Sequence, residues 1–230
     1  TGGNNREHRR RKGFAIEFLY GVNSDLSVAL SGAFVKKTME HWANSTDNAS
    51  LYQFYQNEAK GLSDIKLTGI YDVYQGQAMR GWAHLGVSVP LGAVDSSADA
   101  VDPNNIGGLP VSVQLPYQQQ LGSGTFDLHP GFTLDFQNGN SSLGLQAKAV
   151  VRIGDNSRGW TKGNTFQGNL WAGFKASDWA SATLGLKYAS WGDISGMDEA
   201  IDFNSAHLEV EKSHRHVGPS GGSPTHGRSD

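Results

Sequence analysis

Cysteine is absent from this 230-residue chain, and charged side chains are scarce. Without cysteine the protein can form no disulfide, no thiolate metal site and no thiol nucleophile. Charged residues make up 18% of the chain, below the roughly 25% that is usual for soluble globular domains. The formal net charge is only −3, which gives no general electrostatic reason to expect nucleic-acid binding.

Long hydrophobic runs are also missing. The two most apolar stretches, residues 14–22 and 83–94, are short and contain Glu17, His84 and Ser88. A membrane-spanning helix needs about 20 mostly apolar residues, so the sequence predicts no such helix. Aromatic residues nevertheless make up 10% of the chain, which argues against disorder over most of its length.

Hydrophobic and polar residues alternate with a period of two in eight segments. In residues 142–153, for example, Leu143 and Leu145 have one parity while Gln146 and Lys148 have the other. Because successive side chains of a β-strand point to opposite faces, this period predicts strands, and helical spacing fits it poorly. The eight predicted strands are residues 14–21, 26–34, 64–74, 79–89, 126–136, 142–153, 167–176 and 179–189.

The connections between these strands alternate in length. The short ones are residues 23–25, 75–78, 138–141 and 177–178, and the long ones are residues 37–63, 90–125 and 154–166. Pairing the strands as hairpins therefore places short turns at one end of the sheet and long loops at the other. Bacterial outer-membrane barrels have this asymmetry, with short periplasmic turns and longer external loops.

A soluble β-sandwich or a lipocalin-type barrel would also alternate and tolerate long loops. Three features favour a membrane barrel instead: charges on one face of each strand, a nearly uncharged opposite face, and aromatic residues at strand ends. Those aromatic residues are Phe14, Tyr20, Tyr71, Phe126, Phe136, Tyr188 and Trp191. The predicted fold class is all-β, an antiparallel up-and-down transmembrane β-barrel of about eight strands in the bacterial (Gram-negative) outer membrane.

Several sequence blocks occur in the order typical of one protein family. They are GLSDI at 61–65, LGVSVPLG at 85–92, LPYQ at 115–118, LGSGTFDLHPG at 121–131, VRIGD at 151–155 and YASWGDISGMD at 188–198. In these blocks the chain resembles a family of outer-membrane proteins linked to the meta-pathway of phenol degradation. The resemblance covers about residues 14–203 and implies a transporter or channel for small, aromatic or hydrophobic compounds.

The two ends of the chain lack this pattern. We expect residues 1–13 to be a disordered basic leader, residues 14–203 to be the outer-membrane barrel domain and residues 204–230 to be a disordered tail. Barrels of this kind end in an amphipathic strand with a terminal aromatic residue, whereas residues 213–230 have no period of two. We therefore expect a truncated or frame-shifted member of the family.

The polar faces of the predicted strands carry charges of both signs, which suits a water-filled lumen. The candidate lumen-lining residues are Glu17, Lys66, Asp72, Arg80, His84, Asp127, His129, Asp135, Lys148, Arg152, Lys175 and Lys187. In a wide barrel they would tune passive or facilitated diffusion of a small-molecule permeant. In a narrow barrel they would pair and plug the interior, leaving a structural or adhesion protein that transports nothing.

Catalysis is the third and weakest alternative. His84 with Ser88, or His129 with Asp127, lie on one strand face as a hydrolase site would require, but the chain has no GxSxG nucleophile elbow. His214 and His216 lie in the glycine-rich tail without further oriented ligands. We therefore expect no enzyme activity, no metal and no cofactor. The expected partners are outer-membrane lipid and the permeant, and the oligomeric state stays open.

Overall fold

The computed structural model of the protein describes residues 8–44, 52–100 and 111–201. The predicted tail, residues 204–230, and the histidines within it lie outside the described residues. Within the described part of the chain, no helix is long and apolar enough to cross a membrane.

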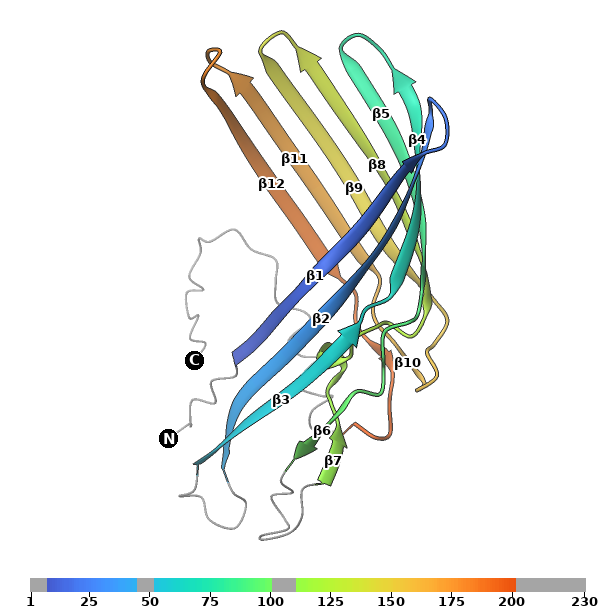
Figure 1. Ribbon diagram of the computed structural model, residues 1–230, viewed down its shortest axis with the longest axis vertical. Coiled ribbons are helices and arrows are strands. Elements are labelled where there is room, and N and C mark those ends of the chain that lie inside the picture. The colour runs from blue at the N-terminus through green and yellow to red at the C-terminus, as the bar shows by residue number, and fades with distance from the viewer. Residues whose placement is uncertain (1–7, 45–51, 101–110, 202–230) are drawn as a thin grey trace, which may run out of the picture.

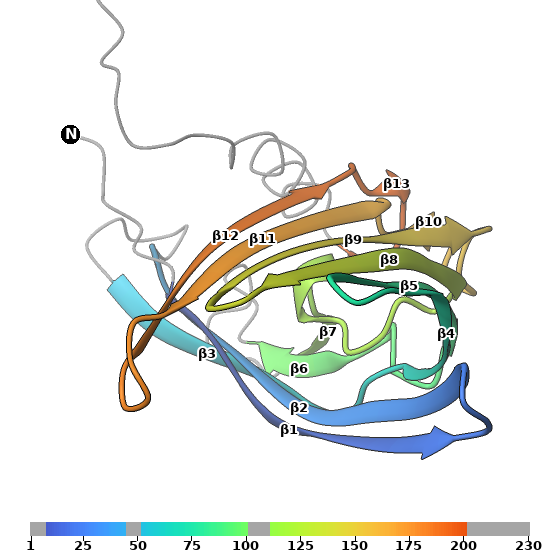
Figure 2. The same ribbon diagram turned by 90° about the horizontal axis from the view of Figure 1, so that it is seen from above.

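Eight antiparallel strands form one curled sheet, in the order β1-β2-β4-β5-β8-β9-β11-β12 (Figures 1 and 2). Their bounds are β1 His8–Gly21, β2 Leu26–Asn44, β4 Ile65–Gln75, β5 Met79–Val89, β8 Phe126–Asn138, β9 Ser141–Ile153, β11 Thr165–Lys175 and β12 Ser181–Trp191. Each strand pairs with its successor along this path, so the all-β, up-and-down prediction is confirmed. Figure 2 shows that the sheet curves around a concave face. Among the described residues β1 and β12 are its edges.

Short turns lie together at one end of the sheet, as the sequence predicts (Figure 1). The β1–β2 turn illustrates why the chain reverses there. The Asn23 side-chain oxygen accepts hydrogen bonds from the backbone N–H groups of Asp25 (2.9 Å) and Leu26 (2.8 Å). Asparagine favours turns because its side chain can satisfy nearby backbone donors in this way. We call this end the turn end and the opposite one the loop end.

A ninth strand, β3 (Tyr52–Leu62), corrects the prediction of a loop over residues 37–63. Strand β2 continues to Asn44, and β3 pairs with its second half. In the second half of β2 and in β3, hydrophobic and polar residues do not alternate regularly, so the sequence shows no period of two. Strand β1 likewise begins at His8, so residues 8–13 of the predicted leader belong to the sheet.

The two long connections 90–125 and 154–166 also contain structure that the sequence did not predict. The first holds β6 (Ser97–Ala100), β7 (Val111–Gln114) and the 3-10 helix η1 (Tyr117–Gln119). Two further short strands, β10 (Trp160–Thr161) and β13 (Ser195–Gly196), pair with each other. Figure 2 shows β6 and β7 on the concave side of the sheet.

The loop end has its own hydrophobic packing. One buried cluster joins Val35 and Ala59 of β2 and β3 to Leu115 and Leu121 of the first long connection. A second cluster consists of Val94, Tyr117, Trp160 and Ile201. We call the described parts of the first long connection, residues 90–100 and 111–125, the cover segment, because these contacts hold them against the inner face of the sheet at its loop end.

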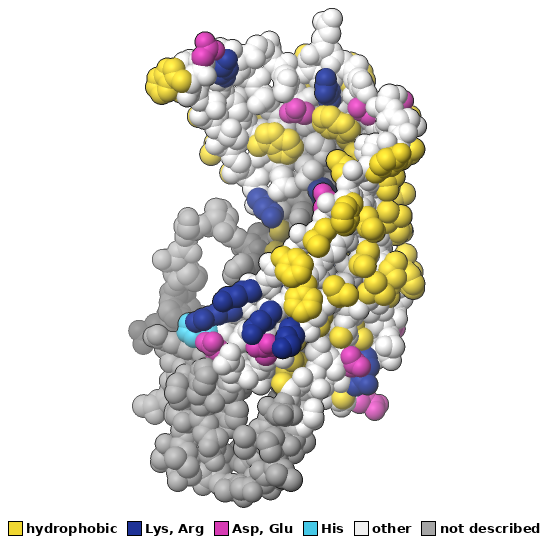
Figure 3. Space-filling model, in the orientation of Figure 1, with side chains coloured by type: hydrophobic (Ala, Val, Ile, Leu, Met, Phe, Trp, Pro, Cys, Tyr) yellow, Lys and Arg dark blue, Asp and Glu magenta, His cyan; other side chains and the backbone are white. Residues whose placement is uncertain are grey.

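The convex face of the sheet is apolar and exposed (Figure 3). On β8, for instance, Phe126, Phe132 and Phe136 are 60%, 44% and 39% exposed. With a rise of about 3.4 Å per residue and a tilt of about 40°, ten residues of strand span about 26 Å. Outer-membrane barrels carry an apolar band about 25 Å tall, so the length of this face suits a lipid bilayer.

Candidate functional site

One polar row crosses four strands of the concave face near the loop end. Backbone pairing places Lys66 of β4 beside Ser88 of β5, Ser88 beside Asp127 of β8, and Asp127 beside Arg152 of β9. All four residues have the polar parity of their strands. Because cross-strand neighbours on one face lie about 5 Å apart, the register itself brings these side chains close together.

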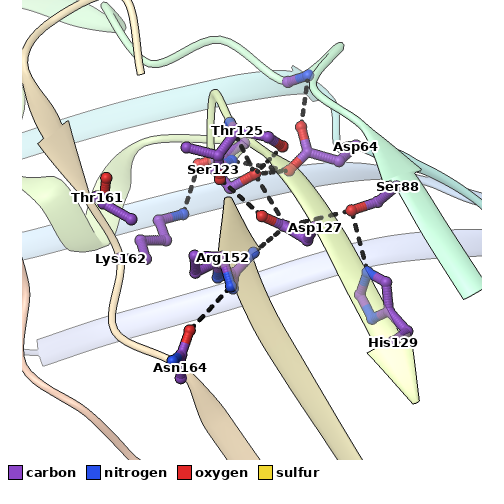
Figure 4. Close-up of polar contacts among 12 residues, drawn as sticks. Asp64, Ser88, Ser123, Thr125, Asp127, His129, Arg152, Thr161, Lys162 and Asn164 are labelled. Carbon is purple, nitrogen blue, oxygen red and sulfur yellow. Dashed lines mark hydrogen bonds and ion pairs between the residues drawn. The ribbon is translucent and has the colours of Figure 1, made fainter. Parts of the chain in front are cut away.

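Asp127 is the centre of this row and is only 2% exposed (Figure 4). Its carboxylate forms an ion pair with Arg152 and accepts hydrogen bonds from Thr125 Oγ1 (2.6 Å) and Ser123 Oγ (3.2 Å). Ser88 Oγ also donates to it, at 3.2 Å. A buried carboxylate is stable only when it is paired and hydrogen-bonded, and the sequence supplies four partners from three segments of the chain.

Asp64 attaches the cover segment to the sheet. The register between β2 and β4 differs by one residue from that between β2 and β3, so the chain has a bulge between Leu62 and Ile65. Bulges redirect side chains. Here the carboxylate of Asp64 accepts hydrogen bonds from Gly92 N (3.0 Å), Ser123 N (2.7 Å) and Ser123 Oγ (2.8 Å).

Two lysines bind backbone carbonyl groups of the same segment. Lys37 Nζ donates to the carbonyl oxygens of Gln118 (3.0 Å) and Gln120 (2.6 Å), and Lys162 Nζ donates to that of Gly122 (2.5 Å). Burial, reinforced by repulsion from Arg11, lowers the pKa of Lys37 to about 8. Burial, reinforced by repulsion from Lys37 and Arg152, lowers the pKa of Lys162 to about 7.

The lowered pKa of Lys162 predicts that stability rises with pH. Below pH 7 the ammonium group is charged in both states, and folding bears the full cost of burying it. Above pH 7 the folded protein releases the proton while the unfolded chain keeps it up to about pH 10.5, so the free energy of unfolding increases by at most about 1.4 kcal/mol per pH unit. Urea unfolding between pH 6 and 9.5, followed by tryptophan fluorescence, measures this slope.

Lys162→Met provides the control for that pH dependence. The variant should lose the rise in stability assigned to Lys162 while remaining folded, because the methionine chain fills the same space without a charge. An identical slope in both proteins would show that the Lys162 amine is not the responsible group.

A second row of hydrogen-bonded polar side chains crosses the sheet closer to the turn end. His84 Nε2 lies 2.9 Å from Thr133 Oγ1, Gln146 Nε2 donates to the same hydroxyl at 2.9 Å, and Asn169 Nδ2 donates to Gln146 Oε1 at 3.3 Å. These four side chains come from β5, β8, β9 and β11. Apart from the titratable imidazole of His84, this second row is uncharged, in contrast to the ion-paired row at the loop end.

A cavity of about 380 Å³ opens on the concave face. Its lining includes five of the twelve predicted lumen residues: Glu17, Lys66, His84, His129 and Lys148. Asp127 and Arg152 form the buried pair described above, beside this cavity. The structure therefore brings seven of the predicted residues to the cavity and the adjoining row.

The other five predicted residues lie closer to the turn end and are not part of the cavity. Arg80 and Asp135 are opposite each other in the β5–β8 register, and Lys187 is opposite Asn169. Asp72 accepts a hydrogen bond from Gln75 at 2.7 Å, and Lys175 pairs with exposed Asp178 at 2.7 Å. That any of the twelve residues contacts a permeant stays a prediction.

Sequence reasoning missed the residues that hold the cover segment, namely Lys37, Asp64, Ser123 and Lys162. Two of them lie in the sequence blocks GLSDI and LGSGTFDLHPG, which gave the only signal that could have found them. Lys37 and Lys162 lie in segments predicted to be loops, where parity says nothing about the direction of a side chain.

The geometry around Ser88 differs from a hydrolase triad. In such a triad the histidine lies between serine and carboxylate, so that it can take the serine proton. Here Ser88 lies in the middle: its hydroxyl donates to Asp127, and His129 Nε2 is 3.0 Å from the same oxygen. Ser88 is also only 3% exposed. Within the described residues, no group of three or more His, Asp or Glu side chains is placed to hold a metal ion.

Comparison with solved structures places this sheet among known folds. An outer membrane channel from Pseudomonas putida F1 superposes on 84% of the chain with a TM-score of 0.50 and 13% sequence identity. The fold is that of an outer-membrane channel. The chain spans 64% of the length of that protein. No family model matches the sequence, and no curated protein matches it either.

Proposed function

We propose that the chain forms part of an outer-membrane channel through which small solutes diffuse without covalent chemistry. The observation that carries the proposal is the division of the sheet into an exposed apolar convex face and a polar concave face with a cavity of about 380 Å³. The fold shared with an outer membrane channel supports the same function.

The proposed permeation path runs along the concave face, where Glu17, Lys66, His84, His129 and Lys148 line the cavity. Charges of both signs there would bind water and polar solutes weakly, as transport requires. The resemblance to the phenol-degradation family supports small aromatic compounds as permeants. Aliphatic atoms of Ala29, Ile70 and Pro130 in the same lining offer such compounds an apolar contact.

A specific observation favours the alternative of a barrel whose interior is plugged and which transports nothing. Ser88, Asp127 and Arg152 bond to one another and to the cover segment. Such mutual pairing fills part of the interior. A channel requires that the cavity stay connected to the loop end past the cover segment. In a plugged barrel the cover segment blocks this connection.

Conductance across planar lipid bilayers tests the proposal. The refolded chain should produce discrete current steps in potassium chloride, and adding phenol or benzoate to one chamber should reduce the open-channel current if these compounds enter the path. Correctly inserted protein that passes no ions at any voltage would contradict channel function and favour the plugged barrel.

A further inference from the structure

Three lysines lie side by side on the outer surface of the sheet. The register places Lys12 of β1 opposite Lys36 of β2, and Lys36 opposite Lys60 of β3. All three are exposed. Like charges directly opposite each other on neighbouring strands destabilise a sheet. The lysine row therefore lowers the stability of the fold, and folding alone does not explain its presence.

The lysine row borders the apolar surface at the loop end. Two residues closer to the turn end, the register forms the row Phe14, Phe34 and Leu62, with the two phenylalanine rings stacked at 5.9 Å. Side chains two residues apart share a strand face, so the lysines and these hydrophobic residues point the same way. Figure 3 shows lysine and arginine side chains clustered at this border of the hydrophobic surface.

Nearby carboxylates neutralise only part of this charge. Lys36 pairs with Glu58 at 2.5 Å, and Arg10 pairs with Glu40 at 3.8 Å. Lys12 and Lys60 form no ion pair with any described residue. The hydrogen bond from Lys36 lowers the pKa of Glu58, so that carboxylate is ionised at neutral pH. Two positive charges remain in excess at the border.

We propose that the lysine row binds the phosphate groups of a phosphorylated lipid headgroup at the loop-end surface of the membrane. Lysine is a common phosphate ligand, and basic residues at a membrane surface attract anionic lipid. Two strand spacings of about 4.8 Å make the row about 10 Å wide, which is wide enough for a headgroup carrying two phosphates. The adjacent Phe14, Phe34 and Leu62 would contact the acyl chains of the same molecule.

This inference rests on the proposed membrane placement, and the test separates the two. Full-length protein is refolded in neutral detergent, and bound lipid A is counted by native mass spectrometry with the bis-phosphorylated, monophosphorylated and dephosphorylated forms. We expect affinity to fall in that order. The triple variant K12Q/K36Q/K60Q should bind the bis-phosphorylated form at least tenfold more weakly, whereas K12R/K36R/K60R should bind it like the wild type.

Glu58→Gln gives an effect in the opposite direction. Removing this carboxylate frees Lys36, so affinity for the bis-phosphorylated lipid should increase several-fold. Insertion of wild type and variants into vesicles of neutral phosphatidylcholine is measured in parallel. If the protein does not insert, the membrane placement is wrong. If it inserts but binds all three lipid forms equally, or if the glutamine triple variant binds like the wild type, the lysine row is no headgroup site.

Discussion

Asp127→Ala is expected to lower the free energy of unfolding by about 3–5 kcal/mol, the usual cost of removing one partner of a buried ion pair. Arg152 would keep its charge at 15% side-chain exposure without its carboxylate. Ser88, Ser123 and Thr125 would each lose an acceptor. Urea unfolding of the refolded protein, followed by tryptophan fluorescence, measures this change.

Asp178→Ala is the matched control, because it also replaces an aspartate by alanine but breaks an exposed ion pair instead of a buried one. Asp178 pairs with Lys175 but is 99% exposed, and exposed pairs contribute little. We expect a change within about 0.5 kcal/mol. Equal losses in the two variants would mean that burial does not govern the strength of the Asp127 pair.

Asp64→Ala is expected to release the cover segment and raise the conductance at least twofold. The carboxylate accepts three hydrogen bonds from Gly92 and Ser123, and hydrogen bonds to charged groups contribute about 1.5–3 kcal/mol each. If the substitution removes only about 2.8 kcal/mol of the free energy that holds the cover segment in place, the population of molecules with this segment detached rises about a hundredfold. Single-channel currents in planar bilayers measure the outcome.

Asp25→Ala serves as the control for that experiment, since Asp25 lies in the β1–β2 turn at the opposite end of the sheet. Its conductance should equal that of the wild type. A variant of Asp64 with wild-type conductance and wild-type stability would show that these hydrogen bonds do not close the cavity.

The alternating pattern predicted most of the sheet because lipid and water select side chains on opposite faces. In residues 142–153 the match with β9 (Ser141–Ile153) is within one residue. The turn around Asn23 was predictable for a different reason, since its side chain satisfies local backbone donors. Both signals are local, and each reports a contact with solvent, lipid or neighbouring backbone.

The loop end was not predictable by the same means. Strand β3 as far as Gly61 lies beyond the apolar band, so lipid does not select hydrophobic residues on its outer face, and the period of two disappears. The contacts of Asp64 and Lys162 join residues 28 to 59 positions apart in the chain. They depend on a bulge and on the path of the cover segment, which single-sequence periodicity does not encode. Asp127 and Arg152 were predicted on the correct face, but their mutual pairing followed only from the strand register.

In the membrane, the convex face of the sheet should meet lipid and the concave face should meet water. The absence of cysteine allows this arrangement to be tested by single substitutions along β9. With the protein in lipid vesicles, Gln146→Cys and Lys148→Cys should react with a water-soluble maleimide at least tenfold faster than Leu145→Cys and Ala147→Cys. Equal rates at all four positions, or faster reaction at positions 145 and 147, would contradict the membrane-sheet account.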